Sequence, residues 1–287
     1  KKVMVIGGGP AGLETARVAA ARGHQVSLWE KGNDLGGMIL VAAKAPGRDG
    51  FDELPRYYRY QMKLLGVDVH LNTEVTVDTV KRENPDVVVV AIGSLPRIPD
   101  DIKGIEQDNV VNNVRDVLTG KAEVGQNVLI VDCQRHIQGL STADFLAQQG
   151  KKVELITPYP SPGEEMEGIT RMTLFQRLYQ AGVKITPSTM LKEISGNTVT
   201  VTAVRMGLAG TLRAEMLEAL VTPTGTGEER VIENIDTVIL SYGGIPNDKL
   251  YYALKGQAKE VYAVGDCRGI RKLVWATNDG AALAREI

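Results

Sequence analysis

Short apolar runs alternate with a helical pattern from the first residues of the chain. Lys2–Ile6 is an apolar run of the kind found in strands buried in a parallel sheet. Leu13–Arg22 is rich in alanine and predicts a helix, and Val26–Glu30 predicts a second strand that ends on a carboxylate. This order of strand, helix and strand predicts a βαβ unit of an α/β fold.

The same order recurs near the middle of the chain. Asn127–Asp132 predicts a strand, residues 139–149 a helix and Lys152–Ile156 a second strand. The chain therefore predicts two nucleotide-type folds in tandem, the second inserted in the first. The predicted domains are residues 1–122 with 242–287, and residues 123–241.

Further elements follow from periodicity and from glycine and proline positions. We expect helices at Phe51–Gly66, Ile169–Gly182 and Trp275–Ile287. We expect a buried strand at Pro85–Gly93 and further strands at Val67–Leu71, Ile235–Ser241 and Val261–Val264. The repeated alternation over Val183–Val221 predicts a meander of antiparallel strands, and Gly225–Gly227 predicts a turn.

A glycine-rich turn, Gly7–Gly12, joins the first strand to the first helix. Gly7 permits a tight turn, Gly9 lets the backbone approach a pyrophosphate, and Gly12 lets the helix pack closely on the strand. Pro10 suits the first helical position, where an N–H is not needed. Since the N–H groups and dipole of the helix face the turn, it predicts a site for a nucleotide diphosphate.

The residues after the second strand extend this prediction. Glu30 lies where a carboxylate can accept hydrogen bonds from ribose hydroxyls. Gly36 and Gly37 indicate backbone that lies close to another group, which is a pyrophosphate or ribityl chain in nucleotide-binding flavoproteins. A plain loop is the alternative at these two glycines, and the sequence alone leaves it open.

The second turn, Asp132–Gly139, departs from the first. Gly139 is its one glycine and stands where helix packs on strand, so the glycines that permit a tight turn and phosphate approach are missing. Gln134 or Arg135 would occupy the volume of a phosphate. The following strand ends in Thr157-Pro158, with neither a carboxylate for a ribose diol nor an arginine for a 2′-phosphate. We infer that this unit keeps the fold and has lost dinucleotide binding.

Few other residues indicate catalytic, redox or metal-binding chemistry. His136 has no identifiable partner that would activate it, so we expect a structural or surface histidine. Cys133 and Cys267 are far apart and form no CxxC or CxxxxC pair, which argues against a disulfide framework and a sequence-adjacent redox disulfide. No catalytic residue and no metal site is identified.

Composition narrows the class of protein. The 287 residues are 43% hydrophobic and 24% charged, typical of a globular protein, and are enough for two domains. The net charge of −2 favours neither a nucleic-acid nor an anionic-membrane surface. No apolar run is long enough to span a bilayer, and we expect a cytoplasmic protein. Because the chain begins within a strand and without Met, we expect a piece of a longer protein.

Through several of the residues described above, the chain resembles the pyridine nucleotide–disulfide oxidoreductases, which are flavoproteins with two dinucleotide folds. The resemblance implies an α/β fold class with two tandem Rossmann-like domains, the second inserted in the first. It also implies that the carboxylate of Asp266 lies near the ribityl and pyrophosphate part of FAD. The residues that carry it are Val5–Gly12, Glu30, Gly36-Gly37, Ala91–Gly93 and Gly265-Asp266.

The glycine turn and the resemblance together give one set of expected cofactor-binding residues. These are Gly7, Gly9, Pro10, Ala11, Gly12, Glu30, Lys31, Gly36, Gly37, Met38, Ala91, Gly93, Gly265 and Asp266.

A closer resemblance, to the C-terminal module of large iron–sulfur flavoenzymes, rests on three segments: Asp116–Lys121, Pro246–Tyr251 and Ala284–Ile287. That group includes 2,4-dienoyl-CoA, bile-acid and enoate reductases and trimethylamine dehydrogenase. It implies a preceding barrel with FMN and an iron–sulfur cluster, which this chain lacks, so we expect the chain not to perform substrate chemistry alone.

The degraded second turn resembles the amine dehydrogenases, which pass electrons to an electron-transfer flavoprotein. Three hypotheses follow: an FAD-binding redox module, a non-redox scaffold that holds ADP in the same site, and an NAD(P)H-dependent reductase module. The isoalloxazine could meet the N-terminus of a helix after Asn278–Gly280. Trp275 could stack on a flavin, although we expect a buried core tryptophan.

Overall fold

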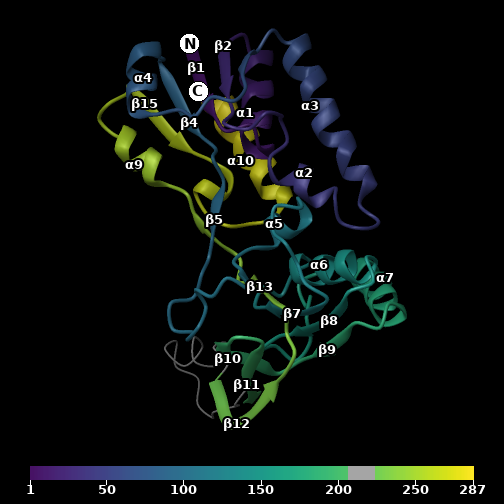
Figure 1. Ribbon diagram of the computed structural model, residues 1–287. Helices are drawn as coiled ribbons and strands as arrows, with labels where there is room; N and C mark the ends of the chain where they lie inside the picture. Colours follow the sequence, from purple (N-terminus) through teal and green to yellow (C-terminus); the bar gives the residue numbers. More distant parts are fainter. Residues whose placement is uncertain (206–223) are drawn as a thin grey trace, which may run out of the picture. The chain divides into compact units, whose positions relative to one another are not determined.

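The computed structural model describes residues 1–205 and 224–287, and these form two compact units (Figure 1). The first unit comprises Lys1–Leu95 and Gly244–Ile287, and the second comprises Pro96–Gly243. The second unit is therefore inserted in the first along the sequence, and each contains a parallel sheet. The predicted fold class is confirmed.

A five-stranded parallel sheet forms the centre of the first unit, in the order β15-β4-β1-β2-β3. Valines on both sides of β4 are fully buried, as expected for a strand covered on both faces. The strands are β1 (Lys2–Ile6), β2 (Gln25–Trp29), β3 (Asp68–His70), β4 (Val87–Val90) and β15 (Glu260–Ala263).

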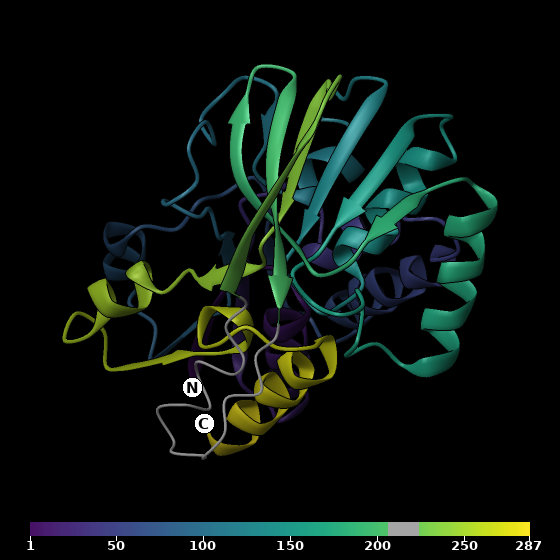
Figure 2. The same ribbon diagram turned by 90° about the horizontal axis from the view of Figure 1, so that it is seen from below.

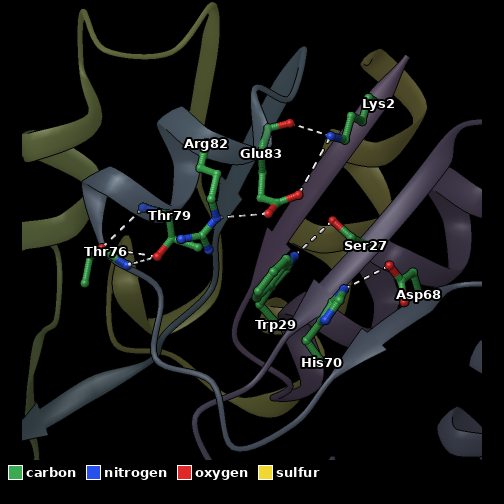
Figure 3. Close-up of polar contacts among 9 residues, drawn as sticks. All are labelled: Lys2, Ser27, Trp29, Asp68, His70, Thr76, Thr79, Arg82 and Glu83. Atoms are coloured by element: carbon green, nitrogen blue, oxygen red, sulfur yellow. Dashed lines mark hydrogen bonds and ion pairs between the residues drawn. The ribbon is translucent and has the colours of Figure 1, made fainter.

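Helices cover both faces of this sheet (Figure 1). One face packs on α1 (Pro10–Ala21), α3 (Glu53–Leu64) and α10 (Leu273–Glu286). The other packs on α4 (Val77–Glu83) and α9 (Lys249–Leu254). Thr76 and Thr79 cap α4 reciprocally, which fixes where that helix begins (Figure 3). Short helices are α2 (Met38–Ala42), η1 (Asp49–Asp52) and η2 (Gly265–Cys267).

The second unit has its own parallel sheet, in the order β6-β13-β7-β8-β9, with helices on one face and a three-stranded antiparallel sheet on the other (Figure 2). The parallel strands are β6 (Val110–Val111), β13 (Thr237–Ser241), β7 (Asn127–Asp132), β8 (Lys152–Ile156) and β9 (Lys184–Thr186). The helices are α5 (Val114–Leu118), α6 (Gln138–Ala147) and α7 (Gly168–Gln180). The antiparallel strands are β10 (Thr189–Ser195), β11 (Thr198–Arg205) and β12 (Thr224–Ile232).

Two short paired strands, β5 (Ser94–Pro96) and β14 (Gly244–Pro246), lie where the chain passes between the units. Residues 96–122, which the sequence division assigned to the first domain, group with the second unit. The reason is local packing, because β6 pairs with β13 and α5 packs beside α6.

Two local predictions are wrong. Gly225–Gly227 lies inside β12 and is not a turn, because this segment pairs with β11. Asn278–Gly280 lies within α10, which already begins at Leu273, so no helix starts after these residues. The predicted antiparallel meander is confirmed over β10 and β11. It is wrong for its first part, because β9 pairs in parallel with β8. Its part at residues 206–221 lies outside the described residues. None of the described helices is long and apolar enough to cross a bilayer.

Candidate nucleotide-binding site

The expected cofactor-binding residues of the first unit follow directly after strands of one parallel sheet. The Gly7–Gly12 turn follows β1, Glu30 follows β2, Ala91 follows β4, and Gly265-Asp266 comes just after β15. Since the carboxyl ends of parallel strands share one edge, four separate segments meet there. This edge is where open α/β sheets bind ligands.

Two glycines of the turn are required by the fold itself. Gly7 has φ of +107°, and a Cβ added to it would lie 2.4 Å from the carbonyl oxygen of Ala91. A Cβ on Gly12 would lie 2.0 Å from the carbonyl oxygen of Gly7. Any side chain at either position would collide with backbone, so these glycines set the close packing of α1 on β1 and β4.

Gly9 differs from its neighbours because nothing lies within 4 Å of where its Cβ would be. Its φ of −80° and ψ of 179° are extended and suit any residue, so the fold does not require glycine here. Gly9 is the N-cap of α1 and Pro10 is the first helical residue. The first N–H groups of a helix have no partner within it, so open space beside Gly9 leaves room for an anion.

The carboxylate of Glu30 is fixed by the backbone of two loops. Its Oε2 accepts a hydrogen bond from the Gly8 N–H at 2.6 Å, and its Oε1 accepts one from the Gly32 N–H at 2.6 Å. A carboxylate oxygen has two lone pairs, so each oxygen can still accept a hydroxyl. The half-buried Glu30 is thereby held next to the glycine turn in an orientation suited to a diol.

The Gly36-Gly37 loop lies against the glycine turn. The Gly36 N–H donates to the carbonyl oxygen of Gly8 at 2.8 Å, and a Cβ on Gly37 would lie 3.0 Å from the Cα of Gly9. The close neighbour of these glycines is therefore the turn itself. Met38 begins α2, is 45% exposed and follows directly, and Lys31 is exposed on the same loop.

The last two segments contact the others unequally. Ala91 is buried against Gly7, and a Cβ on Gly265 would lie 2.8 Å from the Cβ of Ala11. Gly93 instead accepts a hydrogen bond at its carbonyl oxygen from the Asn247 N–H at 3.1 Å. The glycine turn, Glu30, Ala91 and Gly265 thus form one contiguous group, and Gly93 instead contacts the residue that follows β14.

Asp266 is half-buried on η2, and burial raises the pKa of its carboxyl. Its Oδ1 accepts a hydrogen bond from the Arg271 N–H at 3.2 Å. The side chain of Arg271 pairs with Asp279 on α10, and Asp279 also accepts from the Gly265 N–H at 3.4 Å. This bridging of η2 to α10 by Asp279 was not predicted from the sequence.

Trp275 is 51% exposed in the first turn of α10, so the expectation of a core tryptophan is wrong. The helix packs on α1 through Gly280 instead, where a Cβ would lie 2.5 Å from the carbonyl oxygen of Ala11. Ala276 in the same first turn packs against the core, while the neighbouring indole of Trp275 is accessible.

An aromatic pair next to Glu30 also escaped prediction (Figure 3). The rings of Trp29 and His70 are stacked with centroids 3.8 Å apart, and His70 Nε2 lies 2.9 Å from Asp68 Oδ2. The His70 carbonyl oxygen accepts the Glu30 N–H at 2.8 Å. The sequence signal was the shared position of Trp29 and His70 at the ends of adjacent strands, which only the β2–β3 register reveals.

Strand register aligns the second turn with the first. Ile6 pairs with the last residues of β2 and β4, and Val131 pairs with Ile156 and Leu240 in the same way. Asp132 therefore stands at the position of Gly7, and its partner Ser241 stands at the position of Ala91. The second turn is also longer, since Gly139 follows Asp132 by seven positions where Gly12 follows Gly7 by five.

Side chains fill the second turn where the first is open. Gln134 Nε2 donates to Ser241 Oγ at 3.1 Å, and Arg135 Nη2 lies 2.8 Å from Glu164 Oε2. The guanidinium of Arg135 also lies 5.0 Å from the ring centroid of Tyr159. The Arg135 contacts hold the loop after β8 against the turn, and Gln134 packs on the end of β13 through Ser241.

Cys133 lies in the second turn and Cys267 on η2, and neither thiol is activated. Burial raises the pKa of the Cys133 thiol to about 12 and that of Cys267 to about 11, so both are neutral thiols. His136 is half-buried on the turn. Within residues 1–205 and 224–287, no group of three or more His, Cys, Asp or Glu side chains is placed to hold a metal ion.

Comparison with known proteins agrees with this geometry. The model of the pyridine nucleotide-disulphide oxidoreductase family matches residues 1–280. The chain is 38% identical over 265 residues to N,N-dimethylglycine/sarcosine dehydrogenase of Chromohalobacter salexigens, and 33% identical over 259 residues to a probable N-methylproline demethylase of Rhizobium meliloti. These matches cover 90% and 89% of the chain. Among solved structures, a 2-naphthoyl-CoA reductase complex matches the whole chain with a TM-score of 0.87 and 33% identity.

The chain spans only part of these relatives. It covers 35% of the length of the dehydrogenase and of the demethylase, and 40% of the reductase chain. The relatives are thus larger multidomain enzymes, and the chain corresponds to one nucleotide-binding module of them.

Proposed function

Because the chain belongs to the pyridine nucleotide-disulphide oxidoreductase family, a family of flavin-dependent oxidoreductases that bind FAD and NAD(P), we propose that it is the FAD-binding electron-transfer module of a larger flavoprotein. The proposed parent enzyme is of the amine dehydrogenase or demethylase type. The similarity to a dimethylglycine/sarcosine dehydrogenase and to a probable N-methylproline demethylase supports that choice.

The observation that carries the proposal is the open space beside Gly9. A methyl group at Gly9 would meet no protein atom, whereas one at Gly7 or Gly12 would collide with backbone. A glycine that the fold does not need, at the N-terminus of a helix, fits a position reserved for the close approach of a ligand pyrophosphate. Glu30, fixed by two backbone N–H groups, fits the ribose of the same nucleotide.

The residues present therefore fit the ADP part of FAD. Gly9 and the first turn of α1 would hold the pyrophosphate, Glu30 the ribose, and Asp266 the ribityl side. FAD would supply one- and two-electron redox chemistry in the bound state. The protein's own contribution is binding and orientation, with Gly265 and Ala11 keeping η2 and α1 in contact. The exposed Trp275 at the start of α10 is a candidate to stack on the flavin ring.

We propose that the second unit binds no nicotinamide dinucleotide. Asp132 stands where the first unit has Gly7, and Gln134 and Arg135 are packed against Ser241 and Glu164. An electron donor other than NAD(P)H then has to reduce the module. An FMN and iron–sulfur barrel domain of the parent enzyme is the proposed donor, and an electron-transfer flavoprotein the proposed acceptor.

An absorbance spectrum of the purified chain, with mass analysis of the nucleotide released on heating, tests the proposal. A yellow protein that releases FAD is expected. A colourless protein that releases ADP would replace the redox module with a scaffold that holds ADP, since Gly9 and Glu30 fit both ligands. A chain that binds neither nucleotide would overturn the proposal.

An NAD(P)H-dependent reductase module is the second candidate, and the similarity to a 2-naphthoyl-CoA reductase favours it. It requires NAD(P)H to bind in the second unit and bleach the flavin. Mixing the FAD-loaded chain with NADH under anaerobic conditions separates the two candidates. Rapid bleaching supports the reductase, and an unchanged spectrum supports the module proposed here.

A further inference from the structure

The second turn contains a buried carboxyl group that the proposed function does not use. Asp132 is fully buried, and its Oδ2 is the one buried side-chain atom among the described residues that has no hydrogen-bond partner. Its Oδ1 accepts a hydrogen bond from Ser241 Oγ at 3.0 Å. A buried carboxylate with an unpartnered oxygen is far costlier than the neutral acid, so the environment favours the protonated form.

Helix α6 closes over this carboxyl group. A Cβ on Gly139 would lie 2.7 Å from Asp132 Cγ and from Oδ1, so the first turn of the helix packs directly on the acid. An ionised Asp132 could regain hydration only if this turn moved away from the end of β7.

The acid is linked by hydrogen bonds to the chain that leaves the second unit. Ser241 donates to Asp132 and accepts from Gln134 Nε2. A Cβ on Gly243 would lie 3.6 Å from Gln134 Cδ, and the Gly243 carbonyl oxygen accepts the Arg97 N–H at 3.0 Å. The buried acid is thus connected to Ser241–Gly243, the return connection.

The groups that face Asp132 offset the cost of burying its charge only in part: the Ser241 hydroxyl and the Gln134 backbone N–H favour the carboxylate, and burial outweighs them. The titratable groups near it include the thiol of Cys133 and the phenols of Tyr159 and Tyr242, and burial raises the pKa of all three, so they are neutral near pH 7. His136 lies half-buried on the same turn. β13 faces the acid with Ser241 and α6 faces it with Gly139. The cation of the turn, Arg135, is paired with Glu164 and lies 3.8 Å from Glu165.

We propose that Asp132 is a proton-controlled switch of the return connection: the neutral acid holds Ser241 and Gln134 in place, and its ionisation releases the turn and Ser241–Gly243. Burial raises the pKa of Asp132 to about 7, which sets the transition near neutral pH. This inference concerns the second unit alone, so it can fail while the proposed nucleotide site in the first unit stands.

Two backbone amides report on the switch. The Cys133 N–H donates to the Ser241 carbonyl oxygen at 2.9 Å, and the Arg97 N–H donates to that of Gly243. In the full chain, their opening equilibrium by hydrogen exchange, corrected for the intrinsic rate, should rise about tenfold per pH unit between about pH 5 and pH 7. It should level off at higher pH, because Asp132 is then ionised in both states.

Asp132→Asn has nearly the same shape and no charge at any pH, and it should abolish this pH dependence. Asp144→Asn is the matched control, because Asp144 is also buried in the second unit but pairs with Arg177 at 2.7 Å. The Asp144→Asn control should keep the wild-type pH dependence of the opening equilibrium. An Asp132→Asn chain that keeps the wild-type slope would overturn the proposal.

A direct titration keeps the proposal testable if Asp132→Asn does not fold. The 13Cγ resonance of Asp132 should titrate near pH 7, and Ser241→Ala should move that midpoint upward by removing a donor that favours the carboxylate. A midpoint below about pH 5 in the wild type, or one that Ser241→Ala leaves unchanged, would contradict the switch.

Discussion

The two strand-to-helix turns of this chain occupy equivalent places in two similar units and differ in what fills them. In the first, a Cβ on Gly7 or Gly12 would meet backbone and one on Gly9 would meet nothing. In the second, Asp132 stands at the position of Gly7, and Gln134 is bonded to Ser241. One fold thus supports either an open site at the helix N-terminus or a turn filled by its own side chains.

The difference teaches that glycine content alone does not identify a binding turn. Gly7 and Gly12 are explained by packing, as is Gly139 in the second turn, where a Cβ would collide with Asp132. Among the glycines at positions 7, 9 and 12 of the first turn, Gly9 alone has no packing contact that requires glycine. A test of the nucleotide site should therefore target Gly9, since changes at the other glycines would disturb the fold.

The largest effect on nucleotide affinity is expected at Gly9. Gly9→Val should place methyl groups in the open space and weaken ADP and FAD binding more than about 100-fold, equivalent to about 3 kcal/mol. The melting temperature should change little, since the backbone at Gly9 is extended. Isothermal titration of the nucleotide-free protein measures both ligands. Gly50→Val is the control, because Gly50 is also surrounded by open space and should leave affinity unchanged.

The second prediction concerns how the free energy of unfolding depends on pH. The pKa of Asp132 is raised from 3.8 to about 7 in the folded chain, so stability is greatest below the unfolded value and falls as pH rises through 7. The loss amounts to at most about 4 kcal/mol. Urea unfolding at several pH values should show it in the wild type and not in Asp132→Asn. If the free energy of unfolding changed with pH in the same way in both proteins, the raised pKa of Asp132 would be contradicted.

Gly7→Ala tests whether the first turn requires glycine for folding. The added Cβ meets the Ala91 carbonyl oxygen and must adopt a left-handed φ, so we expect a loss of about 3 kcal/mol in the free energy of unfolding. Gln134→Gly in the second turn should cost about 1 kcal/mol, the value of one hydrogen bond. Chemical denaturation measures the free energy of unfolding of both variants. Equal losses would contradict the conclusion that the fold requires glycine at position 7.

Glu30→Gln should weaken nucleotide binding about tenfold, because an amide has a single oxygen for the bonds from Gly8, Gly32 and a ribose. Titration with ADP and with 2′-deoxy-ADP measures the ribose contribution. The variant should bind both nucleotides with similar affinity. A preference for ADP that survives in Glu30→Gln would place the ribose elsewhere.

The smallest effect is expected at Asp266. Asp266→Ala should weaken FAD about threefold to tenfold and leave ADP nearly unchanged, because the carboxyl is assigned to the ribityl side. Titrating the same protein preparation with FAD and with ADP measures the loss of affinity for each ligand. Equal weakening of the two would contradict that assignment.

The sequence predicted the fold class and the first turn well, because strand, glycines, helix and acid lie within about 30 residues. The absence of two glycines from the second turn is read directly from the sequence, and the loss of dinucleotide binding there stays a prediction. It misassigned residues 96–122 because the β6–β13 pairing joins positions far apart in the chain. Trp275, Asp279 and the Trp29–His70 stack were missed or misjudged for the same reason, since their environments depend on packing between distant elements.

The account depends on one nucleotide being held beside Gly9 and none in the second unit. The most direct measurement is the amount of adenine nucleotide released per chain by the wild type and by Gly9→Val, each saturated with FAD and desalted. The account predicts one nucleotide per wild-type chain and almost none for the variant. Two nucleotides per wild-type chain, or full retention by Gly9→Val, would contradict it.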